Sequence, residues 1–345
     1  MVCAHPGTTY PDGMVRTALT LAALATSAVA GLDVTSATRF GALGSGNFEK
    51  ATLTNREGRR LIIRVPRMQS AADYATADLA GLRALSTGVR GKLPFAVPRY
   101  LGEVAVEATR AIVYDFLPGD PLALSELASI TELAASVGRS LAAIHSLPTG
   151  FVIDAGLPLV RPLDALSGVV SIMDRAGSTG LVPGALLSRW ERATEDPALW
   201  QYAPTVINGG LTASSFIHGD NAVTGVVGWA LLSVGDPARD LFWALSTSAT
   251  DASDGVLDEY NKTRGSSDRQ VKKRAMLYAE LELAKWLLHG TEVKSTAIVD
   301  DAIAMLHNVV DFVQNDLNRR IDTNTRPVLS VAEVEEMLDR DDRKE

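Results

Sequence analysis

Several residue types are scarce in this 345-residue sequence, and each scarcity excludes a class of protein. The single cysteine, Cys3, cannot form an internal disulfide, and the five histidines lack metal-ligand spacing, which excludes a disulfide scaffold and a structural zinc site. Basic residues are outnumbered by acidic ones, and the net charge of −8 argues against a nucleic-acid partner. With 46% hydrophobic and 21% charged residues, the chain has the composition of a globular protein with a large core.

One apolar stretch near the N-terminus, Met14–Asp33, permits two interpretations. Its arginine, apolar run and small residues before Gly31 fit a secretory signal peptide. Its leucines and alanines fit equally well a helix packed on the edge of a domain, and the thirteen residues that precede Met14 favour this helix. We therefore expect a cytoplasmic protein. No membrane span is expected, because no other stretch approaches the roughly 20 apolar residues that a span needs.

The first third of the chain alternates between strand and helix patterns. Residues 36–66 contain two β-rich runs joined by the turn Asn55–Gly58, and residues 70–86 carry leucines at helical spacing. Strand character returns in residues 95–104 and 110–117, before the Pro118–Pro121 cluster breaks regular structure. The pattern indicates a β-rich lobe that ends near this cluster.

Beyond the cluster, the apolar spacing becomes helical. Leu133 to Ile144 recur at helical intervals, residues 271–289 form an amphipathic helix that Gly290 is expected to close, and an apolar stripe runs from Val299 to Leu317. The expected organisation is an N-terminal extension with an apolar helix (1–35), a β-rich lobe (36–117), a helical lobe (118–325) and a charged tail (326–345).

Five segments in this order resemble landmarks of the aminoglycoside and macrolide phosphotransferase family. They are AIVYDFLPGDPL, VGRSLAAIHSLP, VTGVVGW, VGDPARDL and YAELELAKWLLHG, and with their flanks they cover roughly residues 36–320. The stretch LIIRVPR resembles the third-strand motif of the macrolide kinases, with arginine where protein kinases carry lysine. The resemblance implies an α+β, protein-kinase-like fold of two lobes, with a small β-rich N-terminal lobe and a larger helical C-terminal lobe.

The family's catalytic loop can be aligned with this sequence in two ways. In such kinases the Asp of a His-Gly-Asp accepts the hydroxyl proton, an Asn five residues later holds Mg²⁺, and an Asp before a Trp binds the second metal. Aligning His218–Asp220 with this loop would put Gly225 at the Asn position and leave too few residues before Asp236. Aligning Asn208–Leu211 instead makes His218–Asn221 the turn of a hairpin, which suits these residue types. We adopt this second alignment.

In this alignment, the three positions that carry the chemistry hold no acid. Gly210, in the loop that starts at Asn208, stands at the base position, and Ser215 and Gly228 stand at the two metal positions. A phosphotransferase mechanism requires those groups, so we predict a pseudokinase with a binding or regulatory role. The alternative is an active ATP-dependent small-molecule O-phosphotransferase with relocated acids. The candidate acids are Asp115, Asp220, Asp236 and Asp240, although the resemblance implies structural roles for the last two.

The nucleotide site that the resemblance implies is only partly present. Gly44 and Gly46 lie where the family has a phosphate-covering loop, but they also fit an ordinary turn. Arg64 lies at the position of the cation that contacts phosphate in the family. The alternative is a surface arginine at the end of a strand. Asp78 replaces the helix Glu that pairs with this cation and is one methylene shorter. The linker residues that could face an adenine ring are Tyr114, Phe116 and Leu117. We expect ATP and magnesium to bind weakly or not at all. We expect the cleft to bind an unidentified protein or small molecule instead. His145 is expected to be a packed structural residue.

Overall fold

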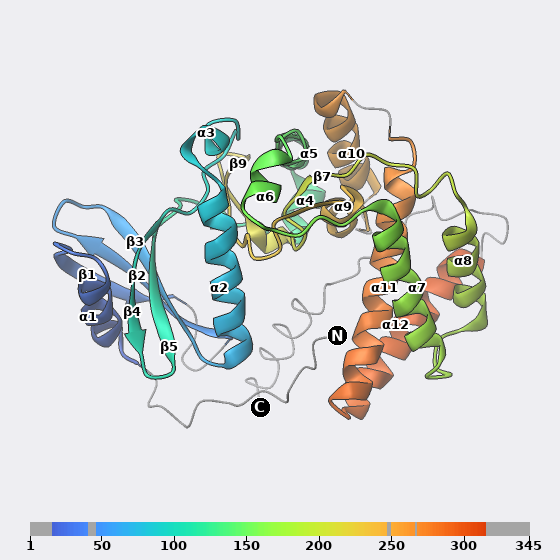
Figure 1. The fold of residues 1–345 in the computed structure, drawn as a ribbon, viewed down its shortest axis with the longest axis horizontal. Helices are drawn as coiled ribbons and strands as arrows, with labels where there is room; N and C mark the ends of the chain where they lie inside the picture. Colours follow the sequence, from blue (N-terminus) through green and yellow to red (C-terminus); the bar gives the residue numbers. More distant parts are fainter. Residues whose placement is uncertain (1–15, 41–45, 247–249, 266–267, 315–345) are drawn as a thin grey trace.

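The computed structural model describes residues 16–40, 46–246, 250–265 and 268–314. It has the protein-kinase-like arrangement of a β-rich N-terminal lobe and a helical C-terminal lobe (Figure 1). The N-terminal lobe contains α1 (Ala18–Ala28), β1 (Val34–Arg39), β2 (Phe48–Asn55), β3 (Arg60–Pro66), α2 (Gln69–Ala84), α3 (Thr87–Arg90), β4 (Tyr100–Val106) and β5 (Thr109–Asp115). The C-terminal lobe contains β6 (Asp120–Pro121), α4 (Leu124–Ser129), α5 (Thr131–His145), α6 (Gly150–Asp154), α7 (Pro162–Gly177), α8 (Gly184–Glu195), β7 (Thr205–Ile207), the 3₁₀ helix η1 (Ala213–Ser215), β8 (Phe216–Gly219), β9 (Ala222–Val226), β10 (Ser233–Gly235), α9 (Ala238–Leu245), α10 (Thr250–Arg264), α11 (Val271–Glu292) and α12 (Thr296–Gln314).

An antiparallel sheet in the order β1-β2-β3-β5-β4 forms the N-terminal lobe. The hairpin expected within residues 36–66 is present, because β2 and β3 pair directly and the Asn55 side chain accepts the N–H of Arg59 at 2.8 Å across the turn. Along β3, Leu61 and Ile63 are buried on the face that α1 covers, while Ile62 packs toward the main core. This alternation gives the sheet two apolar faces.

Helix α1 covers one face of this sheet (Figure 1). Leu21 and Ala25, one turn apart, are completely buried in a cluster that includes Leu53 and Ile63 of the sheet. The apolar stretch near the N-terminus is therefore, from Ala18 onward, a packed helix of the fold. Of the helices that the structure describes, none has both the length and the apolar character needed to cross a membrane.

Helix α2 covers the opposite face and joins the sheet to the C-terminal lobe. The helix expected over residues 70–86 begins at Gln69 and ends at Ala84. Gly81 lies against the backbone of Trp229, where a Cβ atom would overlap the Trp229 carbonyl oxygen. The absence of a side chain at this position is what lets α2 dock directly on the other lobe.

The strand expected from residue 95 begins only at Tyr100. Before it, Ala96 makes a single isolated bridge to Gly225. Pro98 has no N–H to donate, and the Arg90 guanidinium takes the carbonyl oxygens of Val97 and Pro98 at 3.0 and 2.9 Å. These backbone groups are therefore used by a side chain rather than by a neighbouring strand.

Helices α5, α9, α10 and α11 build the centre of the C-terminal lobe. Helix α5 follows the spacing of its apolar residues as expected, but the prediction that Gly290 closes α11 is wrong, because the helix continues to Glu292. A Cβ atom at Gly290 would lie 2.8 Å from Ile298 Cγ2, so this glycine permits the close approach of α12. Leu317 and the charged tail lie outside the described residues.

Candidate functional site

The loop that follows β7 lies on the C-terminal lobe and is held by a carboxylate from α9. The Asn208 N–H donates to Asp240 Oδ2 at 2.7 Å, and the Gly209 N–H donates to Asp240 Oδ1 at 2.7 Å. Gly209 has a φ of +82°, a conformation that favours glycine. Asp240 is completely buried, so its carboxylate holds the loop from the interior of the lobe and is not exposed at the surface.

His145 lies behind this carboxylate. Its Nε2 is 3.3 Å from Asp240 Oδ2, its Nδ1 is 2.9 Å from the Tyr260 hydroxyl, and only 2% of the residue is exposed. Burial raises the pKa of Tyr260 to about 12, so its phenol stays neutral at physiological pH. As expected from the sequence, His145 is a packed structural residue.

The hairpin after the loop has the arrangement that the adopted alignment predicts. Strands β8 and β9 pair from Phe216↔Val226 to Gly219↔Ala222, and Asp220 and Asn221 form the turn with φ of +51° and +59°. At about 3.3 Å per residue, the strand holds the Asp220 backbone on the order of 15 Å from Ser215. The His-Gly-Asp at 218–220 is therefore part of the end of the β8–β9 hairpin.

Two of the three positions without acids, Gly210 and Gly228, contact the Asn208 side chain. Its Nδ2 donates to the Gly228 carbonyl oxygen at 2.8 Å, and its Oδ1 accepts the Gly210 N–H at 3.3 Å. Ser215 caps its own short helix, because its Oγ accepts the Thr212 N–H at 3.2 Å. The contacts link the loop to Gly228, but the positions at 210, 215 and 228 offer no carboxylate.

Two large side chains occupy the space beside the glycines. A Cβ atom at Gly210 would lie 3.0 Å from Leu231 Cδ1, and a Cβ atom at Gly228, whose φ is +77°, would lie 2.9 Å from the Tyr74 hydroxyl. Leu231 is 56% exposed and Tyr74 is 41% exposed. Neither residue was predicted from the sequence. Tyr74 was detectable, because it lies four positions before Asp78 on the same helix face, whereas nothing in the sequence marks Leu231.

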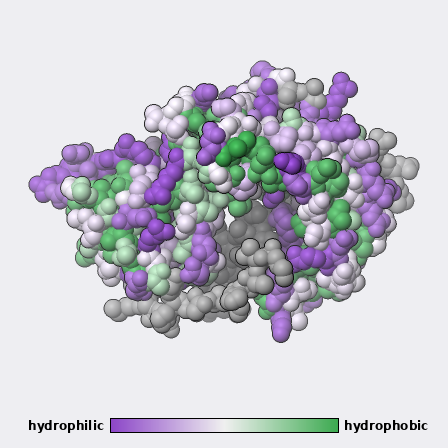
Figure 2. Space-filling model, viewed as in Figure 1, coloured by the Kyte–Doolittle hydropathy of each residue, from purple (hydrophilic) through white to green (hydrophobic). Residues whose placement is uncertain are grey.

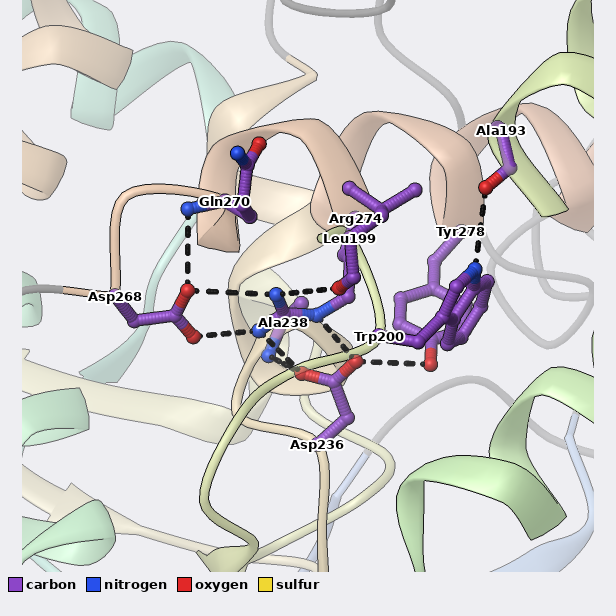
Figure 3. A network of polar contacts seen from close by, with 9 residues as sticks. All are labelled: Ala193, Leu199, Trp200, Asp236, Ala238, Asp268, Gln270, Arg274 and Tyr278. Atoms are coloured by element: carbon purple, nitrogen blue, oxygen red, sulfur yellow. Dashed lines mark hydrogen bonds and ion pairs between the residues drawn. The ribbon is translucent and has the colours of Figure 1, made fainter. Parts of the chain in front are cut away.

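The remaining acids near the site are engaged in structural contacts. Asp236 is 1% exposed and receives Arg274 Nε at 2.7 Å, the Tyr278 hydroxyl at 3.0 Å and the Ala238 N–H at 2.9 Å (Figure 3). This network fixes the turn before α9 to α11, in line with the structural role expected for Asp236. Asp115 forms ion pairs with Arg59 and Arg99. Within the described ranges, no group of three or more His, Cys, Asp or Glu side chains is arranged to hold a metal ion.

The N-terminal lobe contributes a cation and a buried acid. Arg64 Nη1 lies 4.0 Å from Asp78 Oδ2, so the two charges are neighbours without a close hydrogen bond. The Arg64 guanidinium also lies over the Phe48 ring, 4.2 Å from its centroid. Asp78 Oδ1 accepts the Trp229 N–H at 2.6 Å. Burial raises the pKa of Asp78, while Arg64 and this N–H act in the opposite direction.

The linker residues point in different directions. Tyr114 is buried, and this burial raises the pKa of its hydroxyl. The Phe116 ring lies under the Arg60 guanidinium at 3.7 Å, and Leu117 packs against Gly225. Gly46 has a φ of +73° and is exposed, and Gly44 lies outside the described residues.

These residues define the interlobe cleft, formed by Phe48, Arg64, Tyr74, Asn208–Gly210, Gly228 and Leu231. Figure 2 shows the surface hollowed between the two lobes. The residues at 210, 215 and 228 do not fit the magnesium ions of a phosphotransferase, because that ion prefers carboxylate and amide oxygens. The cleft has one cation and several apolar or aromatic side chains.

Comparisons with known proteins extend this description. The profile of the phosphotransferase enzyme family matches residues 42–278. The uncharacterized protein YcbJ of Bacillus subtilis (strain 168) is 21% identical over 225 residues, which cover 60% of this chain and 70% of YcbJ. The structure is similar to macrolide 2'-phosphotransferase MphH from Brachybacterium faecium, with 22% identity, a TM-score of 0.69 and coverage of 84% of this chain and 97% of MphH. It is also similar to aminoglycoside 2'-phosphotransferase-IIIa in its GDP complex, with 17% identity, a TM-score of 0.70 and coverage of 87% and 100%.

Proposed function

This chain belongs to the phosphotransferase enzyme family, and we propose that it binds a ligand in the interlobe cleft without transferring a phosphoryl group. The observation that carries the proposal is the absence of a carboxylate at positions 210, 215 and 228, which hold glycine, serine and glycine. General base catalysis is worth on the order of 10²–10⁴ in rate. This corresponds to about 3–5 kcal/mol of barrier, to which the loss of both metal ligands adds.

The positions of the other acids support the same proposal. Asp240 accepts two backbone N–H groups at 2.7 Å, and Asp236 accepts a buried guanidinium. Moving either carboxylate into the cleft would leave buried donors or a buried charge without a partner. Asp220 lies at the end of the β8–β9 hairpin. The alternative of an active small-molecule kinase needs one of these acids or Asp115, which forms ion pairs with Arg59 and Arg99.

The protein is expected to act in the cytoplasm with α1 intact. Leu21 and Ala25 are completely buried against the sheet, so cleavage near Gly31 would remove part of the N-terminal core. This burial supports retention of the helix over its removal as a signal peptide.

The proposal is tested by combining nucleotide binding with turnover. Thermal shift of the full chain is measured with ATP and with GTP, each with Mg²⁺ or EDTA, and phosphoryl transfer is measured on a panel of macrolides, aminoglycosides and other hydroxyl compounds. A competent macrolide 2'-phosphotransferase is assayed alongside as positive control. We expect no magnesium-dependent shift and no phosphorylated product. A product that forms with wild type and disappears in Asp220→Ala would overturn the proposal and identify the relocated acid.

A further inference from the structure

We propose that Tyr74, Leu231 and Arg64 form a metal-independent binding site for an aromatic or apolar ligand with one anionic group, such as a carboxylate or sulfonate. This inference rests on the proposed function, because it assigns a ligand class to the same cleft. It departs from the nucleotide chemistry of the family, since a metal-bound triphosphate needs carboxylates that positions 210, 215 and 228 do not provide.

Two side chains limit the space beside Gly210 and Gly228. Leu231 Cδ1 lies 3.0 Å from the Cβ position of Gly210, and the Tyr74 hydroxyl lies 2.9 Å from the Cβ position of Gly228. Both side chains therefore stand where acidic side chains at 210 and 228 would begin. The floor of the cleft presents a leucine and a phenol at these two places, which favours an organic ring over hydrated magnesium.

The residues of the cleft contact one another across the two lobes. The Phe48 ring meets the Tyr74 ring edge-on with 6.3 Å between centroids, and Tyr74 reaches Gly228. The Gly228 carbonyl oxygen accepts a hydrogen bond from the Asn208 side chain. Gly210, two residues after Asn208, lies against the Leu231 side chain. An unbroken line of contacts therefore runs from the N-terminal lobe to Leu231. Because 41% of Tyr74 and 56% of Leu231 are exposed, a ligand that covers them removes apolar surface from water.

Arg64 gives the cleft a positive charge. Arg64 is 23% exposed in its side chain, and among the described residues its buried Nε has no hydrogen-bond partner. Its nearest acid, Asp78, is 4.0 Å away and accepts the Trp229 N–H at 2.6 Å. Because part of the Arg64 side chain is exposed and its guanidinium lies over Phe48, its charge is available to one anionic group of a ligand on the Phe48 side of the cleft.

The proposal is tested with 8-anilino-1-naphthalenesulfonate, an aromatic monoanion whose fluorescence rises in apolar surroundings. The full-length protein is titrated in EDTA and again with Mg²⁺, and we expect one bound probe per chain with the same Kd in both. Leu231→Ser and Tyr74→Ser should each weaken binding by about fivefold, because each removes apolar contact. Arg64→Gln should weaken it by about tenfold, because it removes a charged hydrogen bond. Circular dichroism and thermal unfolding show whether each variant is folded.

A neutral probe separates the role of charge from that of packing. N-phenyl-1-naphthylamine lacks the sulfonate, so its affinity should fall in Leu231→Ser but stay within about twofold of wild type in Arg64→Gln. The matched controls are Leu19→Ser, in a leucine that is 79% exposed on α1, and Arg192→Gln on the exposed side of α8, and neither should alter binding of either probe.

Several results would overturn the proposal. These are binding of many probe molecules per chain, an affinity that depends on Mg²⁺, or Leu231→Ser and Tyr74→Ser variants that bind like Leu19→Ser. If neither probe binds and Mg²⁺-ATP also fails to bind, only this ligand class is refuted. If Mg²⁺-ATP binds and is turned over, the proposed function itself is refuted.

Discussion

Replacing Arg274 by methionine tests the idea that the turn before α9 is held by a buried ion pair. Arg274 donates to Asp236 from Nε and Nη2 at 2.7 and 3.1 Å, to Asp268 at 2.6 Å and to the Leu199 carbonyl at 3.0 Å (Figure 3). Burial lowers the pKa of Arg274, but the nearby carboxylates of Asp236 and Asp268 raise it by more, so the net pKa lies above its ordinary value. The side chains of Arg274 and Asp236 are both 0% exposed.

Methionine matches much of the arginine's volume but leaves the Asp236 charge buried without its cation. Removing one partner of a buried ion pair costs about 3–5 kcal/mol. Asp236 keeps the Tyr278 hydroxyl and the Ala238 N–H, so we expect the lower half of this range, about 3–4 kcal/mol. The assay is urea unfolding at pH 7, followed by tryptophan fluorescence and far-ultraviolet circular dichroism.

The matched control is Arg175→Met. Arg175 pairs with Glu292 at 2.6 Å, but their side chains are 56% and 60% exposed, so the loss should stay below about 1 kcal/mol. If Arg274→Met lowers the free energy of unfolding by no more than Arg175→Met does, the network in Figure 3 does not stabilise the turn and this reasoning is refuted.

Three further predictions concern the contacts between the lobes and the N-terminal helix. Gly81→Ala should lower the free energy of unfolding by about 1–3 kcal/mol, because the new Cβ overlaps the Trp229 carbonyl, and unchanged thermal unfolding would contradict this. In the folded protein, the pKa of Asp78 lies above its ordinary 3.8. The free energy of unfolding of wild type relative to Asp78→Asn should therefore fall as pH rises through the folded pKa. Parallel pH profiles of the two proteins in urea unfolding would exclude a raised pKa. Leu21→Ser should destabilise the protein by at least about 2 kcal/mol, and N-terminal sequencing of the native protein should find residues 18–28 retained; a mature chain starting near residue 31 would restore the signal-peptide interpretation.

Local pattern was enough to predict several elements of the fold. The hairpin of β2 and β3, helix α2 and helix α5 follow from alternation, from helical spacing and from the turn residues at Asn55–Gly58. The closure of α11 at Gly290 was predicted wrongly, because a glycine is compatible with both a helix end and a close helix contact. Only the position of α12 distinguishes the two.

The sequence by itself determined which chemical groups are present. Positions 210, 215 and 228, which the family resemblance aligns with the base and the metal ligands, hold glycine, serine and glycine, and the composition is that of an acidic globular protein. Tertiary structure alone decided what stands beside those positions. Tyr74, from α2, reaches Gly228 because the two lobes meet at Gly81 and Trp229. Leu231, from the segment before β10, lies against Gly210 within the C-terminal lobe. Side-chain identity is local to the chain, whereas the filling of a cleft depends on residues that folding brings together from distant segments.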